Sequence, residues 1–495
     1  MKKLVFILII ALVSITFAGC SNKNISNYVD RDEIGYCGSS PYLPYFERGE
    51  VYNRITESPF LNVEDNAKSN ISLNANTASY SIIRNAILNH RQVDKDSVRT
   101  EEMINYFSYS SYEEPTEGLP IKLNYGLLDC PWNDENKLLT IGLKTKDIEF
   151  EDTENNLVFL IDVSGSMKGT NRLDLLQEAF LLLINNLKEN DTVSIVTYSG
   201  NTKVVIEGES NKDNLATAIN ELTSGGSTDG SSGINLAYET ALKYFKEDGN
   251  NRIILATDGD FNVGTTSIDD LKTLIKDKAN QQNIYLSVIG VGAGNLNDST
   301  METLANNGNG NYAYLDNLNE AQKVMVDQLN GTMLTVAKDT KAQIEFTSKV
   351  LKYRIIGFEN HMLSNLEYED STTDAGEIGS GLSVTAVYEI VLSDDVTSDD
   401  KLAVANVKYK TPDSEESELL EISIDVNLTE MELDRAEDVK FISAVVEFSL
   451  ILRNSYYKSN SKTSNVIERL ESLDLTEDKS KQEFLTLVQM YENNY

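Results

Sequence analysis

The sequence has few of the side chains that most zinc and catalytic sites need. Its 495 residues include 3 cysteines, 2 histidines, 1 tryptophan and 7 prolines. With so little Cys and His, and with no H-E-x-x-H or C-x-x-C motif, a zinc site is not expected. His90 is predicted to follow a helix and His361 to lie in a turn, and neither is predicted to be catalytic. Because no combination of nucleophile, base and acid is found, the sequence predicts a protein that is not an enzyme.

Basic residues are also scarce. Lys and Arg total 43 against 78 Asp and Glu, which gives a formal net charge of −35. Such an excess of negative charge argues against nucleic acid or an anionic membrane surface as a binding partner. Its simplest consequence is solubility, and the excess of acid by itself identifies no ligand.

Long apolar runs are absent except at the start of the chain. Two lysines precede the mostly apolar residues 4–18, which are followed by Gly19 and Cys20. The run has the length of a signal peptide and is shorter than the roughly 20 residues of a membrane-spanning helix. Small residues just before a cysteine resemble the bacterial lipobox, although Phe17 stands where Leu is usual.

That resemblance implies a signal peptide over residues 1–19 and a lipidated Cys20 at the start of the mature protein. An uncleaved N-terminal anchor is the alternative. Both place the rest of the chain outside the cytoplasmic membrane, in the bacterial cell envelope, with polar residues 20–50 as a tether. Cys37 and Cys130 are then the other cysteines, and a disulfide between them or two free thiols both stay open.

Residues 151–335 are expected to form one α/β domain. Strand-like runs alternate in this region with helices whose apolar residues recur every three or four positions. This alternation predicts a doubly wound, mostly parallel sheet with helices on both faces. The strand-like runs are 157–161, 192–198, 252–256, 284–291 and 312–315, with 203–207 as an antiparallel edge strand.

The flanking regions follow other patterns. Residues 51–150 mix helical and strand-like segments and predict an α+β region, residues 340–430 predict antiparallel β structure, and residues 431–495 return to helical spacing. We expect strands within 120–147 and 341–428 to pair into one β domain. The central domain would then be an insertion, whose two ends must lie close together.

Oxygen-bearing side chains follow two of the predicted strands. The run Asp162-Val-Ser-Gly-Ser166 comes after the first strand and Asp258 after the third, while Thr228 lies in a Gly-rich loop. Ligands of doubly wound sheets bind at the carboxyl ends of the strands. Hard oxygen ligands suit Mg²⁺, with Mn²⁺ or Ca²⁺ as alternatives. The sequence therefore predicts a metal site with the ligands Asp162, Ser164, Ser166, Thr228 and Asp258; a chance set of Ser- and Gly-rich turns is the other interpretation.

The order D-x-S-x-S, Thr, Asp resembles the von Willebrand factor type A domain and its metal-ion-dependent adhesion site. By that resemblance Asp162 fixes the site, the three hydroxyls face the ion, and Asp258 acts through water. An ion held largely by neutral hydroxyls attracts a carboxylate from the Asp or Glu of a protein partner. The resemblance implies recognition by shared coordination. In the alternative, the metal only stabilises the domain and the flanking regions of this envelope lipoprotein bind the partner.

Longer stretches resemble the YfbK-like bacterial lipoproteins, in which an A domain lies between two family-specific regions. One departure concerns Asn74-Ala-Asn76, where the family usually has D-V-D, so an acidic role is not expected there. The matching runs include Thr77-Ala-Ser-Tyr80, Glu101-Glu-Met-Ile-Asn-Tyr-Phe107, Pro131-Trp132-Asn133, residues 251–264 and Tyr353-Arg-Ile-Ile-Gly357.

Overall fold

The computed structural model describes residues 49–148, 153–226, 230–247, 249–259, 268–328, 331, 334–412, 420–428, 431 and 433–494. These residues fall within one compact unit that begins at Glu47. The predicted signal peptide, Cys20, Cys37 and Thr228 lie outside the described residues. Within the described ranges, none of the helices combines the length and apolar character needed to cross a membrane.

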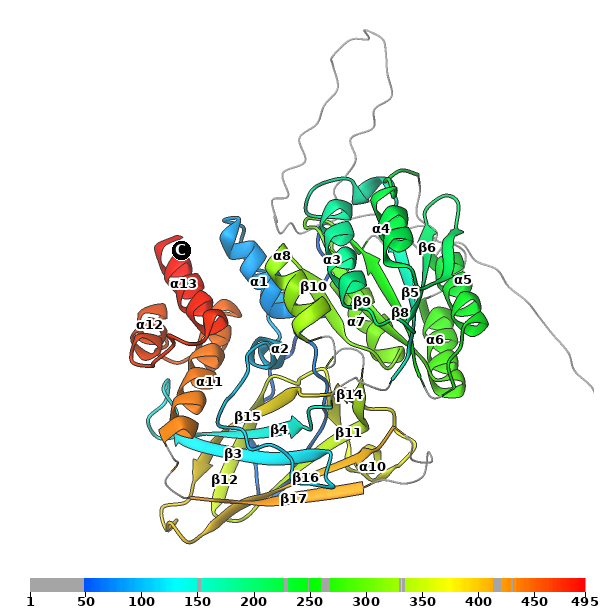
Figure 1. Cartoon of the computed structure of the whole chain (residues 1–495). Helices are drawn as coiled ribbons and strands as arrows, with labels where there is room; N and C mark the ends of the chain where they lie inside the picture. Colours follow the sequence, from blue (N-terminus) through cyan, green and yellow to red (C-terminus); the bar gives the residue numbers. More distant parts are fainter. Residues whose placement is uncertain are drawn as a thin grey trace, which may run out of the picture. The chain divides into compact units, whose positions relative to one another are not determined.

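A six-stranded sheet with the order β10-β9-β8-β5-β6-β7 forms the central domain, as predicted (Figure 1). Neighbouring strands are parallel, except that β7 runs antiparallel to β6 at the edge. The strands are β5 (Asn155–Asp162), β6 (Thr192–Tyr198), β7 (Lys203–Glu209), β8 (Asn250–Thr257), β9 (Ile284–Val291) and β10 (Tyr312–Leu315).

Helices cover both faces of this sheet because its strands carry apolar side chains on both sides. In β5, Phe159 faces one apolar cluster and Leu160 faces the other. On the first face lie α3 (Leu173–Asn186), α4 (Lys212–Asn220) and α8 (Leu318–Gln322), which continues as the π-helical η3 (Lys323–Asp327). On the second face lie α5 (Gly230–Lys243), α6 (Ile268–Gln282) and α7 (Asp298–Asn307).

Two further sheets share one apolar core and form a β-sandwich. The first has the order β1-β12-β15-β4-β3, and the second has the order β13-β2-β11-β16-β17, with β14 paired to β11. The first contains β1 (Leu61–Asn62), β3 (Ile121–Asp129), β4 (Lys137–Thr145), β12 (Val350–Ile356) and β15 (Ser383–Leu392). The second contains β2 (Lys68–Ser72), β11 (Thr335–Phe346), β13 (Met362–Leu363), β14 (Gly376–Gly379), β16 (Lys401–Lys410) and β17 (Leu420–Asn427).

Strands from both sides of the central domain pair directly, since β15 runs antiparallel to β4. This confirms the predicted pairing of residues 120–147 with residues 341–428. The two ends of the central domain also meet at one residue: the Ile148 amide donates to Ser380 Oγ at 2.7 Å, and the Ser380 amide donates to the Leu334 carbonyl at 2.8 Å. The domain is therefore inserted into the sandwich with its ends close together.

A layer of helices covers the outer face of the first sheet. Alternation along the strands places Leu138 of β4 and Val387 of β15 in this helical layer and not in the sandwich core. Aromatic rings join segments from the two ends of the described chain, with the rings of Phe107 and Phe441 4.8 Å apart. The helices are α1 (Ala78–Leu88), α2 (Thr100–Asn105), α11 (Leu433–Leu452), α12 (Thr463–Glu471) and α13 (Lys479–Asn494).

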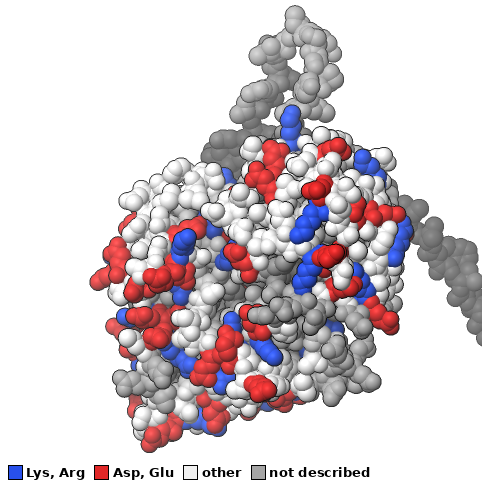
Figure 2. All heavy atoms as spheres, viewed as in Figure 1, with Lys and Arg blue, Asp and Glu red and all other residues white. Residues whose placement is uncertain are grey.

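The central domain is fixed to this helical layer by buried contacts. Ala78 and Ile82 of α1 belong to an apolar cluster of the central domain. Arg84 of α1 pairs with Asp316 at 2.5 Å and with Glu320 at 2.7 Å, and all three side chains are at most 2% exposed. On the face shown in Figure 2, the described Lys and Arg residues are scattered among Asp and Glu and form no continuous basic area.

Candidate metal centre

Two buried aspartates lie at the carboxyl edge of the central sheet. Asp162 is the last residue of β5, and Asp258 directly follows β8. Because β5 and β8 are parallel neighbours, with Ile161 opposite Ala256, their carboxyl ends reach the same edge of the sheet. Both aspartates are fully buried. The structure therefore brings together the two carboxylates that the sequence predicts for one site.

The turn after β5 places two serine hydroxyls beside Asp162. The Ser164 amide donates to Asp162 Oδ1 at 2.8 Å, which turns the chain back on itself. A short 3₁₀ helix, η2 (Gly165–Met167), follows, and the Oγ atoms of Ser164 and Ser166 lie 3.0 Å apart. Thr257 Oγ1 donates to Asp162 Oδ2 at 3.0 Å, so both carboxylate oxygens have a partner.

The Gly-rich loop approaches this turn through its backbone. The Gly165 amide donates to the Gly226 carbonyl at 3.1 Å, and the Gly225 amide donates to the Val163 carbonyl at 2.7 Å. These bonds bring the loop to the edge of the sheet that carries Asp162. Thr228, two residues after Gly226, lies outside the described residues, and its part in the site stays a prediction.

Two residues that contact Asp258 were not predicted from the sequence. Asn295, in the loop after β9, donates through Nδ2 to Asp258 Oδ2 at 2.9 Å. Arg172, which precedes α3, donates to Asn295 Oδ1 at 2.8 Å, and its Nε lies 3.6 Å from Asp258 Oδ2. Asn295 also follows the carboxyl end of a parallel strand, and that position was the signal available for it.

The residues present fit a divalent cation. Burial raises the pKa of Asp162 to about 6, and the nearby charge of Asp258 adds to this rise, while hydrogen bonds from Ser164 oppose it. A divalent ion would offset the repulsion between the two carboxylates, and the available donors are all hard oxygens. Asp162, Ser164, Ser166 and Asp258 would hold it, and their role as ligands stays a prediction.

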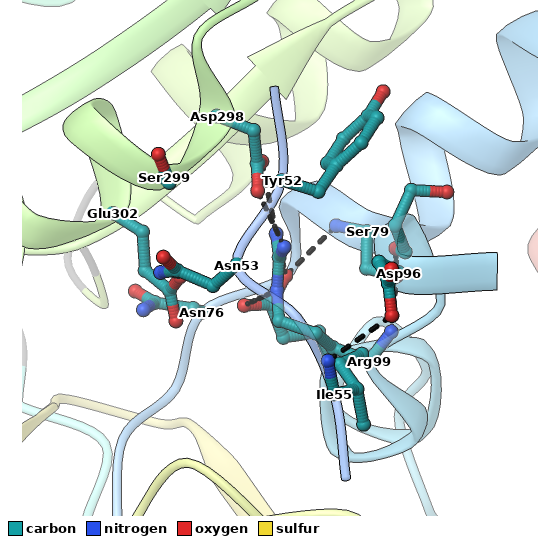
Figure 3. A network of polar contacts seen from close by, with 12 residues as sticks. Tyr52, Asn53, Ile55, Asn76, Ser79, Asp96, Arg99, Asp298, Ser299 and Glu302 are labelled. Carbon is teal, nitrogen blue, oxygen red and sulfur yellow. Dashed lines mark hydrogen bonds and ion pairs between the residues drawn. The ribbon is translucent and has the colours of Figure 1, made fainter. Parts of the chain in front are cut away.

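An N-terminal segment, residues 50–55, lies against the loop that carries Asn295. The Val51 amide donates to the Leu296 carbonyl at 2.8 Å, and the Gly294 amide donates to Glu50 Oε1 at 2.9 Å. Further along, Asn53 Nδ2 donates to Glu302 of α7 at 3.1 Å (Figure 3). The segment thus bonds to both the loop beside the candidate site and the helix that follows it.

A buried ion-pair network lies next to this segment (Figure 3). Arg99 donates through Nη1 to Asp298 Oδ2 at 2.6 Å and through Nε to Glu102 Oε1 at 2.7 Å. Asp298 is the first residue of α7, whereas Arg99 and Glu102 belong to the region before the central domain. The network therefore joins that region to the helix after the Asn295 loop.

Three family models match successive parts of the chain. Residues 47–140 match a model described as von Willebrand factor, and residues 156–327 match the von Willebrand factor type A domain. Residues 331–493 match the C-terminal region of uncharacterized protein YfbK.

Relatives match over different lengths. Uncharacterized protein YfbK of Escherichia coli (strain K12) is 35% identical over 443 residues, which is 84% of this chain and 76% of that protein. Uncharacterized protein sll0103 of Synechocystis is 31% identical over 168 residues, covering 34% of this chain and 39% of that protein. Among solved structures, a von Willebrand factor type A protein from Catenulispora acidiphila aligns with 76% of this chain and 91% of its own, at 11% identity and a TM-score of 0.45.

Proposed function

This chain belongs to the YfbK family of proteins with a von Willebrand factor type A domain, and on that basis we propose that it is a metal-dependent binding protein of the bacterial cell envelope. Domains of this type mediate protein–protein interactions, often through a divalent metal. In this chain, Mg²⁺ at the carboxyl edge of the central sheet would capture an Asp or Glu side chain of a protein partner. No reaction is proposed at the site.

The observation that carries the proposal is the set of oxygens at that edge. Two buried carboxylates supply the charge that holds a cation, and the paired hydroxyls of Ser164 and Ser166 supply neutral ligands. Ser164 is only 3% exposed, whereas Ser166 is partly exposed. The described part of the site is therefore closed on the side of the sheet and reaches solvent beside Ser166, where a partner could approach.

The preference for an acidic partner follows from charge. Asn295 and Arg172 already engage Asp258. Asp162 and the hydroxyls would therefore leave a divalent ion short of negative charge in the direction of solvent, where Mg²⁺ completes its octahedral shell with water. A carboxylate that replaces such a water adds charge and one more hard oxygen. The bound cation would supply this open coordination position, and the chain's own residues would fix the cation in place.

The proposed location rests on the N-terminal sequence. A lipid on Cys20 would anchor the mature protein to the membrane, and residues 20–50 would separate the folded domains from it. Labelling of cells with a radioactive fatty acid tests this step, because a Cys20→Ser variant should lose the label. Equal labelling of the two proteins would refute the anchor.

Metal binding is tested by titrating the purified protein with Mg²⁺ in a calorimeter. Asp162→Ala should abolish the heat of binding. Asp174→Ala is the matched control, because Asp174 lies exposed on α3 of the same domain and should bind Mg²⁺ as the wild type does. Wild-type affinity in the Asp162→Ala variant would refute the site.

Partner capture is tested by cross-linking in intact cells followed by a pull-down. A partner recovered with Mg²⁺, and lost both with EDTA and with Asp162→Ala, supports capture at the metal. Equal recovery in all conditions would refute it. If the metal only stabilises the domain, EDTA will lower the unfolding temperature without changing recovery, and that result favours binding by the flanking regions.

A further inference from the structure

A second cluster of carboxylates lies away from the candidate metal centre. Asp339 of β11, Asp374 and Glu377 of β14 each place a carboxylate oxygen within 4.8 Å of the other two. They line a cavity of about 180 Å³ together with Tyr285 of the central domain and Lys410 of the sandwich. The cluster therefore lies where the central domain meets the sandwich, and not at the carboxyl edge that carries Asp162.

Glu377 points to a missing ligand. Its side chain is only 8% exposed, and its Oε1 is buried without a hydrogen-bond partner among the described residues. A buried carboxylate without a partner is costly, so such groups are normally paired or bind a metal. Since the Glu377 carboxylate faces two other acids, a cation would satisfy it and reduce the repulsion between all three.

Lysines compensate the other two acids. Lys410 Nζ lies 2.6 Å from Asp339 Oδ2, and Lys276 Nζ lies 2.7 Å from Asp374 Oδ2. These pairs neutralise two of the three charges. Burial dominates at Glu377 and raises its pKa well above the usual value, although the positive charges of Lys338 and Arg252 act to lower it, and Glu377 Oε1 has no hydrogen-bond partner among the described residues. Lys276 is 44% exposed, so its ammonium can move aside on its flexible stem and free Asp374 for an ion, whereas Lys410 is 9% exposed and stays with Asp339 Oδ2.

The ligand set favours calcium. The three carboxylate oxygens lie within 4.8 Å of one another, and two oxygens bound to one Ca²⁺ at about 2.3–2.6 Å lie at most about 5 Å apart. Ca²⁺ also tolerates irregular geometry, whereas Mg²⁺ demands a near-ideal octahedron, so side chains already held by other contacts suit Ca²⁺ better. The cavity has room for several waters, which would complete the six to eight ligands that Ca²⁺ takes.

We propose that Asp339, Asp374 and Glu377 form a Ca²⁺ site at the junction of the central domain and the sandwich, separate from the predicted adhesion site. Because two of its acids already have lysine partners, the site binds weakly, with a Kd of about 10⁻⁴–10⁻³ M, as in extracellular calcium modules. It rests on neither Asp162 nor Asp258, and it stands or falls independently of the proposed function.

Terbium luminescence tests this site in the full chain. Tb³⁺ replaces Ca²⁺ and emits when a nearby tyrosine is excited, and Tyr285 lines the cavity. The Asp162→Ala background removes the predicted adhesion site from the measurement. There, Tb³⁺ emission should appear and be competed by millimolar Ca²⁺, and Glu377→Gln should reduce the apparent affinity at least tenfold.

Two controls separate the site from general attraction to an acidic surface. Glu345→Gln changes a carboxylate that is 49% exposed on β11 and should leave emission and competition unchanged. Asp374→Asn repeats the test at a partly exposed member of the cluster, in case Glu377→Gln disturbs folding. Terbium emission that survives both Glu377→Gln and Asp374→Asn would overturn the proposal. Thermal unfolding of the full chain gives a second test: an unfolding temperature that changes with pH but not with Ca²⁺ would show that Glu377 is protonated and binds no ion, and would also overturn the proposal.

Discussion

Replacing Arg99 with Met should strongly destabilise the protein. The Arg99 side chain is 2% exposed, and its partners Glu102 and Asp298 are 1% and 0% exposed. Met preserves much of the volume and the apolar stem but removes the positive charge that is paired with these two acids. The variant therefore leaves two buried carboxylates facing each other across an apolar side chain.

The expected loss is about 4 kcal/mol near pH 8, since removing one partner of a buried ion pair costs about 3–5 kcal/mol. It is not doubled for the two acids, because each can bind a proton instead of staying charged. Protonation sets the sign of the pH dependence. Burial already raises the pKa values of Glu102 and Asp298, and Arg99 opposes that rise. Without Arg99 both pKa values rise further above their unfolded values, so the variant loses more stability as the pH rises and less at pH 5.

Urea unfolding at pH 5 and pH 8 measures this difference. Trp132, the single tryptophan, is 5% exposed in the helical layer and should report unfolding by fluorescence. Arg91→Met is the matched control: the Arg91–Glu50 pair is 36% and 21% exposed, so its loss should cost at most about 1 kcal/mol. A loss below about 1 kcal/mol for Arg99→Met at pH 8, or an equal loss at both pH values, would refute the reasoning.

Three further predictions follow from buried groups. Gly376→Ala should cost about 3 kcal/mol, since the added Cβ would lie 1.8 Å from the Leu73 carbonyl oxygen, whereas Gly49→Ala meets nothing within 4 Å and should be neutral in thermal unfolding. Burial raises the pKa of Glu101 to about 8, above its unfolded value, so the contribution of Glu101 to stability is full below about pH 4.5 and is lost as the pH rises toward 8. Glu101→Gln should therefore change the slope of stability against pH between these values by up to about 1.4 kcal/mol per pH unit, and an unchanged slope would contradict this. Burial also raises the pKa of the Cys130 thiol, so a thiol reagent should label it only after unfolding, and rapid native labelling would contradict its burial.

The central domain could be predicted from the sequence because its signals are local. A parallel strand buried on both faces is a continuous apolar run, and every residue of β5 and β8 is buried. The positions of Asp162 and Asp258 followed from the same runs, since a residue after such a strand lies at the carboxyl edge. Asn295 was missed because its loop has no motif of its own, although it follows β9 in the same way.

Features that depend on distant partners could not be predicted. Strand β2, with the sequence KSNIS, lacks apolar alternation. Its Asn70 is buried, and its side-chain oxygen accepts a hydrogen bond from Gln343, 273 positions away, at 2.7 Å. The helical layer combines the first and last helices of the described chain. The apolar face of each helix shows in the sequence, but the helix against which it packs does not. Arg99 and Asp298, 199 positions apart, are common surface residue types until the fold brings them together.

The meeting of both domain ends at Ser380 has a consequence for protein engineering. The Ser380 hydroxyl and amide form hydrogen bonds with the chain on either side of the central domain. In the topology of the sandwich, that domain is therefore equivalent to one long loop between β4 and β11. A long loop costs little more than a short one to close, because the entropy of closure grows only with the logarithm of its length. The A domain of another family member could therefore be grafted at the same two positions, provided that it keeps the acidic partners of Arg84 and Arg99 in the helical layer.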